Sequence, residues 1–230
     1  MKYVRSICGI AAAAALAGTA SADAVATVLI DGESYEMAAF TAEGAFHLVP
    51  AIYTFGDTVV EALPGPRDAS AAMAYGIAVT DFGAPSVFSF SFSMPITLDA
   101  GPTVANASLV GGMTDFTGNG VGVSTTGGFT TLQSSYVSAP NTNIGVDVGG
   151  SQSYGAGPAG SHYTYGPQAV GPVAGGDLSG FTTLNMDLRF LASGGGDVIV
   201  LTGFTEITVI PAPASLALLG VSGLLARRRR

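Results

Sequence analysis

Val87-Phe88-Ser89-Phe90-Ser91-Phe92-Ser93-Met94 is the stretch of the chain that decides its fold class. From Phe88 onward, large apolar side chains occupy every second position and serines lie between them. Because successive side chains of a β-strand point to opposite faces of a sheet, this alternation predicts a strand with one buried and one solvent-facing side. The same period of two recurs over residues 184–190 and predicts a second strand of this kind.

Shorter apolar runs elsewhere are separated by glycine and proline, which favour turns. They predict further strands at residues 25–30, 34–40, 46–53, 74–80, 104–110, 129–137, 144–148 and 207–210. No long segment between the two ends of the chain has the 3.6-residue period of an amphipathic helix. About ten short strands with turn signals between them predict an all-β fold, an antiparallel β-sandwich or jelly-roll-like domain over residues 23–210.

Residues 149–180 differ from the rest in composition, with ten glycines and three prolines. This composition predicts a long loop, which in a compact domain is either functional or mobile. Tyr163 and Tyr165 lie within it, and exposed tyrosine rings at these positions could stack on sugar rings. The alternative is that these tyrosines pack locally on the sandwich.

The charge of the predicted domain is strongly negative. Arg67 and Arg189 are its only basic residues, against all sixteen Asp and Glu residues of the chain, which gives a formal net charge of −14. A surface of this sign repels nucleic acids and anionic membranes and favours solubility. The single cysteine, Cys8, precedes the domain, so no disulfide is predicted within it.

Residues 1–22 are typical of a secretory signal peptide. Lys2 and Arg5 form a charged start, an apolar segment follows, and Ala20-Ser21-Ala22 supplies the small residues of a cleavage site. Cleavage between Ala22 and Asp23 would leave Asp23 as the first residue of the mature protein. This end of the chain therefore predicts a signal helix, export across the inner membrane, and signal peptidase as a partner.

Residues 211–230 consist of three parts in order: Pro211-Ala212-Pro213, a short apolar segment, and the cluster Arg227-Arg228-Arg229-Arg230. The apolar segment predicts a short transmembrane helix, because its length is only slightly below that of a bilayer span. The arginines would stop transfer and remain on the cytoplasmic side. The tail thus predicts at least a transient membrane anchor.

This tail resembles the PEP-CTERM sorting signal, with Ala212 at the position where the usual motif has glutamate. The resemblance implies that an exosortase-like membrane protease recognises the tail and cuts it near the Pro-Ala-Pro motif. It also implies that the body is then released or attached at the cell surface or in the extracellular matrix. It implies nothing about the fold of the body.

Asp115-Phe116-Thr117-Gly118-Asn119-Gly120 matches part of a calcium loop, because Asp115 and Asn119 offer oxygen ligands at alternate positions. Threonine stands at the third and twelfth positions, where a full EF-hand loop has Asp or Asn and Glu. A turn between two strands that needs no ion explains the same residues. Calcium at Asp115 and Asn119 is the only cofactor that the sequence suggests.

These features predict a secreted, non-enzymatic protein of the cell surface or matrix, with extracellular polysaccharide as a partner. One alternative is a carbohydrate- or calcium-binding module that uses the sandwich face or residues 149–180. Another is a secreted glycan hydrolase or lyase, whose paired carboxylates would have to meet in space because the acids are spread along the chain. His47 and His162 are the only histidines, too few for a three-histidine zinc site, and no Gly-x-Ser-x-Gly motif is present.

Overall fold

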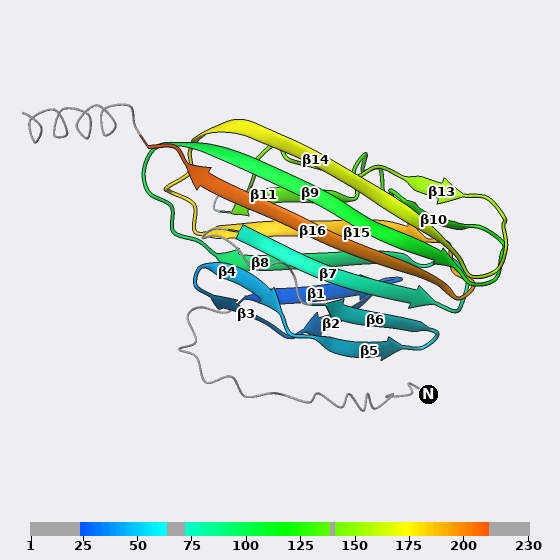
Figure 1. Cartoon of the computed structure of the whole chain (residues 1–230). Coiled ribbons are helices and arrows are strands. Elements are labelled where there is room, and N and C mark those ends of the chain that lie inside the picture. The colour runs from blue at the N-terminus through cyan, green and yellow to red at the C-terminus, as the bar shows by residue number, and fades with distance from the viewer. Residues whose placement is uncertain (1–23, 64–71, 139–140, 212–230) are drawn as a thin grey trace, which may run out of the picture.

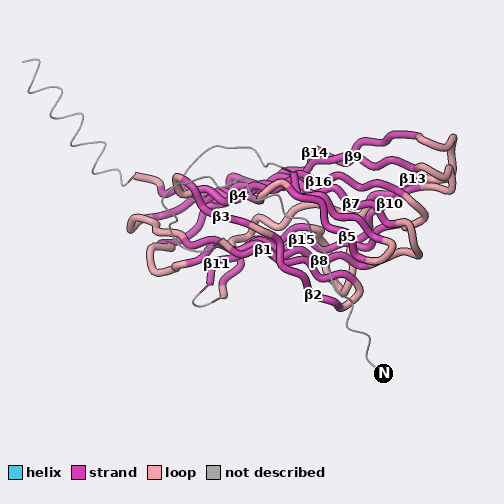
Figure 2. Tube along the Cα trace, turned by 90° about the horizontal axis from the view of Figure 1, so that it is seen from below, coloured by secondary structure: helices cyan, strands magenta, loops and turns pink. Residues whose placement is uncertain are grey.

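The computed structural model describes residues 24–63, 72–138 and 141–211. All sixteen elements within these ranges are β-strands, and they form two eight-stranded sheets that lie face to face (Figures 1 and 2). The predicted all-β sandwich is confirmed.

Both predicted sorting regions extend beyond the described residues. The predicted signal peptide and its cleavage site, Ala20, Ala22 and Asp23, lie outside the described residues. So does most of the predicted tail: Ala212, Pro213, Arg227, Arg228, Arg229 and Arg230. Within the described ranges, no helix is long and apolar enough to cross a bilayer.

The first sheet, sheet A, has the strand order β12-β11-β15-β8-β1-β2, and β10 and β13 extend it beside one end of β15. All of its pairs are antiparallel. The strands with the clearest alternation in the sequence, β8 and β15, are neighbours at its centre. Its strands are β1 (Val25–Ile30), β2 (Glu33–Met37), β8 (Val87–Pro95), β10 (Val121–Ser124), β11 (Gln133–Ser138), β12 (Thr142–Asn143), β13 (Gln152–Tyr154) and β15 (Thr183–Ala192).

The second sheet, sheet B, has the order β14-β9-β16-β7-β4-β3, and β6 and β5 continue it beside the other end of β7. One pair is parallel, β4 with β7, which differs from the antiparallel arrangement that was predicted. On the same side of β7, residues Gly76 to Asp81 pair antiparallel with β6. The parallel pairing is therefore confined to the beginning of β7. The strands are β3 (Ala39–Ala42), β4 (Ala45–Leu48), β5 (Ala51–Phe55), β6 (Thr58–Leu63), β7 (Ala72–Asp81), β9 (Pro102–Asp115), β14 (Ser161–Asp177) and β16 (Asp197–Val209).

The aromatic residues of β8 form the centre of the core, as their alternation predicts. Phe88, Phe90 and Phe92 are at most 1% exposed. The Phe92 ring lies 4.7 Å from the ring of Tyr75 and 5.6 Å from that of Phe46, both of which belong to sheet B. These ring contacts join the two sheets through β8. Burial of each such ring contributes roughly 1.5–3 kcal/mol to stability.

A buried hydrogen-bond network also connects the sheets. The Tyr75 hydroxyl on β7 donates to Gln133 Oε1 on β11 over 2.9 Å. Gln133 Nε2 in turn donates to the Phe204 carbonyl at 3.1 Å and to Thr205 Oγ1 at 3.2 Å, both on β16. Burial, with a smaller contribution from Tyr165, raises the pKa of Tyr75 well above its usual value, so its hydroxyl remains a donor.

Several predicted strands have different bounds in the structure. Residues 34–40 cover parts of both β2 and β3, and residues 46–53 cover parts of β4 and β5, because the chain passes from sheet A to sheet B after Met37 and breaks again at Val49 and Pro50. Residues 144–148 are not a strand, and only Val148 forms an isolated bridge, with Gln133.

The glycine-rich segment 149–180 contains β13 and the long strand β14, which corrects the prediction of a loop. β14 pairs with β9 and forms the edge of sheet B. The register shifts at three places, and the first two, between Tyr165 and Gln168 and between Val170 and Val173, contain Pro167 and Pro172. The third lies between Gly175 and Asp177. An edge strand tolerates proline and bulges because its outer side needs no ladder partner, which is why composition alone hid this strand.

Candidate functional site

The outer face of sheet A carries a charged pair fixed by hydrogen bonds. On β15, Arg189 Nη2 donates to Asp187 Oδ2 over 2.8 Å. On β8, Ser91 Oγ donates to Asp187 Oδ1 over 2.7 Å. Arg189 is the only Lys or Arg residue in the part of the chain that the structure describes, and 33% of its side chain is exposed. The pair is therefore a rigid polar feature that solvent still reaches.

Two aromatic side chains accompany this pair. The Arg189 guanidinium lies over the Phe129 ring, 4.6 Å from its centroid, while Phe129 remains 43% exposed. Tyr136 on the neighbouring strand β11 lies opposite Asn185 in the register of the sheet. Partial burial, and after it the Asp187 carboxylate, raise the pKa of Tyr136, whereas Arg189 lowers it. The Tyr136 hydroxyl is consequently a hydrogen-bond donor at neutral pH.

We call Phe129, Tyr136, Asn185, Asp187 and Arg189 the Arg189 surface. The period of two in β15 places its three polar residues on one face, while Leu184, Met186 and Leu188 are buried on the other. Asn185 Nδ2 donates to Ser138 Oγ over 2.6 Å, which orients the amide. Asn185 and Asp187 are themselves largely buried, at 9% and 8% exposed, so Phe129, Tyr136 and Arg189 are the groups that a ligand would meet first. Aromatic rings beside a charged group suit the C–H faces and the hydroxyls of a sugar.

A hollow of about 310 Å³ adjoins residues 130 and 131, directly after Phe129. Four of the residues that line it are polar: Thr130, Thr131, Asp147 and Gln168. The Gln168 side chain is fixed because its Oε1 accepts a hydrogen bond from the Gly150 amide over 3.1 Å. Polar groups therefore continue from the Arg189 surface toward the edge strand β14.

The two tyrosines predicted to bind carbohydrate lie on β14 and pack inward. Tyr165 is fully buried, its hydroxyl donates to the Gly150 carbonyl over 2.8 Å, and burial raises its pKa to about 12. A ring inside the core cannot stack on a sugar, so Tyr165 does not fit the predicted role. Tyr163 stacks on Tyr154, with ring centroids 4.2 Å apart and an interplanar angle of 14°. This is the local packing that the sequence left as the alternative.

The predicted calcium loop closes on itself. Asp115 Oδ1 accepts the Gly118 amide at 2.6 Å and Oδ2 accepts the Gly120 amide at 2.8 Å, while Asn119 Oδ1 accepts the Thr117 hydroxyl at 2.8 Å. The oxygens proposed as calcium ligands already have partners, so these residues form a turn between β9 and β10. Among the described residues, no group of three or more His, Cys, Asp or Glu side chains is arranged to hold a metal ion.

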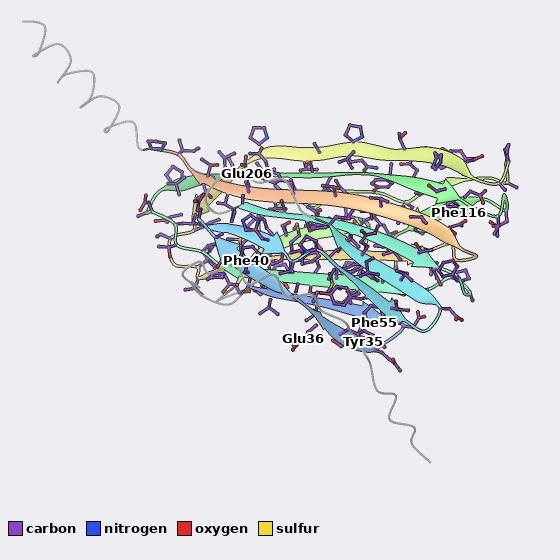
Figure 3. The ribbon with its side chains drawn as sticks, turned by 60° about the horizontal axis from the view of Figure 1, so that its bottom comes forward. Tyr35, Glu36, Phe40, Phe55, Phe116 and Glu206 are labelled. Carbon is purple, nitrogen blue, oxygen red and sulfur yellow. The ribbon has the colours of Figure 1, made fainter. Side chains whose placement is uncertain are left out.

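Asp115 nevertheless belongs to a row of buried acids at one end of sheet B. Asp81, Asp115 and Asp197 are 2%, 0% and 2% exposed, and Asp81 and Asp197 are direct partners on β7 and β16. Burial raises the pKa of Asp197, a hydrogen bond from Ser193 lowers it, the Asp115 charge raises it, and a hydrogen bond from the Phe116 backbone lowers it again. Phe116 projects at the same end of the molecule and is 56% exposed (Figure 3).

Pro211, the first residue of the predicted sorting motif, is exposed and follows β16 closely. The Ile210 amide donates to the Pro102 carbonyl over 2.8 Å, which holds the chain to the sandwich up to this point. β16 ends at the opposite end of the sandwich from where β7 ends and β16 begins, which is where Asp81 and Asp197 lie (Figure 1).

No family model and no curated protein matches the chain. One solved structure with partial similarity is TmCBM61 in complex with β-1,4-galactotriose, at 14% identity and a TM-score of 0.24, covering 68% of this chain and 90% of the other. Another is the infectious bursal disease virus Gx strain, at 9% identity and a TM-score of 0.18, covering 92% of this chain and 69% of the other. Similarities this low carry no argument about function, so the candidate site rests on its own geometry.

Proposed function

We propose that this chain is an exported, non-catalytic β-sandwich protein that binds a neutral polysaccharide through the Arg189 surface. The observation that carries the proposal is the arrangement of Phe129 and Tyr136 beside the fixed Asp187–Arg189 pair. The exposed Phe129 ring and the half-buried Tyr136 ring would give a sugar apolar contact, and charged hydrogen-bond partners give its hydroxyls direction. An open sheet face suits an extended chain rather than a small enclosed ligand.

The charge of the body favours a neutral ligand. Fourteen acidic residues, but only one basic residue, lie in the described ranges. An anionic polysaccharide would be repelled at a distance by this field, and Arg189 is already paired with Asp187. A neutral glycan avoids the repulsion and still uses the same hydrogen-bonding groups.

A glycan hydrolase or lyase remains the alternative from the enzyme class. Glycoside hydrolysis requires one carboxyl group that can give up a proton and a second that acts as base or nucleophile. Both oxygens of Asp187 instead accept hydrogen bonds, from Ser91 and Arg189, which suits positioning of a ligand. No arrangement on the Arg189 surface favours the enzymatic alternative over binding.

Loss of Tyr136 or Phe129 is expected to weaken polysaccharide binding at least about tenfold, the effect of removing roughly 1.4 kcal/mol of contact. The experiment is affinity electrophoresis of the purified protein in gels containing neutral glucans, galactans or mannans, with alginate as the anionic comparison. Tyr136→Ala and Phe129→Ala should migrate as in a gel without polysaccharide.

Tyr163→Ala is the matched control, because it removes an aromatic ring that stacks on Tyr154 away from the Arg189 surface. It should remain retarded like the unmodified protein. Circular dichroism must show that all three variants fold. Retardation that disappears in Tyr163→Ala but persists in Tyr136→Ala would place the site on β14 and reject the proposed surface.

The resemblance of the tail to a PEP-CTERM signal supports a proposal about destination, in which signal peptidase and an exosortase-like protease process the two ends. We expect a mature species that begins at Asp23 and ends near Pro211, in the medium or at the cell surface. Intact-mass spectrometry of medium, envelope and cytoplasm measures this directly. A membrane species that keeps Arg227 to Arg230 would mean that the tail is a permanent anchor.

A further inference from the structure

Figure 1 shows that β7 ends and β16 begins at one end of the sandwich, opposite to the end of β16. Two buried carboxylates lie on facing residues there. Asp81 ends β7 and Asp197 begins β16, and the register of sheet B pairs them directly. Directly opposed residues of an antiparallel pair have Cβ atoms about 4.5–5.5 Å apart on the same face. Each aspartate is only 2% exposed, so both carboxylates point into the protein.

Each of these carboxylates has one oxygen with a donor and one without. Asp81 Oδ1 accepts the Gly83 amide at 3.1 Å, and Asp197 Oδ2 accepts the Ser193 hydroxyl at 2.7 Å. Asp81 Oδ2 and Asp197 Oδ1 are buried and have no partner. Buried acceptors without partners are rare because their desolvation is not compensated. Because these two oxygens belong to facing residues, one bound group could serve as the partner of both.

The described chain offers no cationic side chain to serve as that partner. Its single basic residue, Arg189, is bound to Asp187 on the outer face of sheet A. The other acid of the row, Asp115, adds negative charge, and its own oxygens are occupied by turn amides. No Lys or Arg side chain of the described residues therefore supplies the compensating positive charge, and a bound cation could supply it.

We propose that a divalent cation of the Ca²⁺ class binds between Asp81 and Asp197. Its protein ligands would be Asp81 Oδ2 and Asp197 Oδ1, and its remaining ligands would be neutral oxygens and water. Oxygen donors without histidine or cysteine select a hard cation over zinc. Flexible coordination geometry favours Ca²⁺ over Mg²⁺ in a site made by two strand ends. This site is distinct from the predicted loop at Asp115 and Asn119 and does not depend on polysaccharide binding.

The test is thermal unfolding of the full chain at neutral pH, after treatment with EDTA and dialysis, with increasing CaCl₂ up to about 5 mM, a range that covers weak extracellular sites. We expect Tm to rise with saturation by on the order of 5 °C or more once Ca²⁺ is about 100-fold above its Kd. Isothermal calorimetry should give one site per chain.

Asp81→Asn and Asp197→Asn should each abolish the Ca²⁺-dependent rise, while their Tm in EDTA equals or exceeds that of the unmodified protein. Both changes keep the side-chain shape and remove a buried charge. Glu36→Gln is the control, because it removes one exposed carboxylate from β2 and should leave the rise intact. Calorimetry on the unmodified protein keeps the test decisive if a variant does not fold.

Three results would each overturn the proposal. The first is an unchanged Tm and no calorimetric binding in Ca²⁺. The second is a rise that NaCl of equal ionic strength reproduces, which would mean general screening of an acidic protein. The third is a rise that persists in both variants, which would place the cation elsewhere.

Discussion

Alanine at position 111 is expected to destabilise the sandwich by at least about 3 kcal/mol, the upper range for overfilled positions in a packed protein. A Cβ atom on Gly111 would lie 1.9 Å from the Val200 carbonyl oxygen and 3.0 Å from Leu201 Cδ2. The first of these atoms belongs to the backbone of β16, which pairs with β9 and cannot turn aside like a side chain. Two central strands of sheet B would have to separate, and Tm should fall by on the order of 10 °C.

Gly112→Ala is the control, since it makes the same chemical change at the next residue. The nearest atom to a Cβ there is the Tyr163 carbonyl oxygen at 3.4 Å, an ordinary contact. Its unfolding free energy should therefore stay within about 1 kcal/mol of that of the unmodified protein. Denaturant titration of both variants measures the difference, and equal stability of the two would show that β9 and β16 are not as close as described.

Gln133→Leu is expected to cost about 3 kcal/mol, although leucine has a similar size. The substitution takes the acceptor from the Tyr75 hydroxyl and the donor from the Phe204 carbonyl and Thr205 Oγ1. Each buried polar group left without a partner costs about 1–3 kcal/mol. Ser134→Ala, at the next residue but on the outer face, should change the unfolding free energy by less than about 0.5 kcal/mol.

A double-mutant cycle with Tyr75→Phe separates this network from simple packing. Once Gln133 is leucine, removal of the Tyr75 hydroxyl should restore stability, because the hydroxyl no longer has an acceptor. The coupling between the two positions should be about 1 kcal/mol or more. Additive losses would mean that the two side chains act independently in the core.

Local alternation was sufficient to predict the centre of the fold. The period-two runs at 87–94 and 184–190 correspond to β8 and β15, which pair with each other over nine residues. Residues 25–30 correspond to β1 with the same bounds. Alternation works here because the apolar phase of each strand faces the core.

Strands without that contrast were missed or shortened. β14 buries only Tyr165 fully, and glycines and prolines interrupt its inward phase, so its residues carry little apolar alternation. β16 was predicted only at its end, although Asp197 and Gly203 lie on the same inward phase as Ile199 and Leu201. The Tyr75 ring and the Gln133 amide fill the space that a side chain at position 203 would need. This requirement comes from the packing of distant strands, so the local sequence does not show it.

The candidate site was only partly accessible from the sequence. Asn185, Asp187 and Arg189 are the polar phase of the predicted strand at 184–190, and large polar groups at three successive outward positions contrast with the serines of 87–94. That contrast was an available signal. The approach of Phe129 and Tyr136 to Arg189 depends on the pairing of β11 with β15 and on the turn before it, neither of which is encoded locally.

The irregular edge strand β14 also bears on how the protein behaves when crowded. Fibril growth adds strands to an edge that offers an unbroken row of amide donors and carbonyl acceptors. Pro167 and Pro172 have no amide hydrogen, and the register shifts around them divide the edge into short pieces. Neighbouring molecules therefore find no long template along β14, so this edge resists the strand addition that seeds amyloid even where the molecules are densely packed.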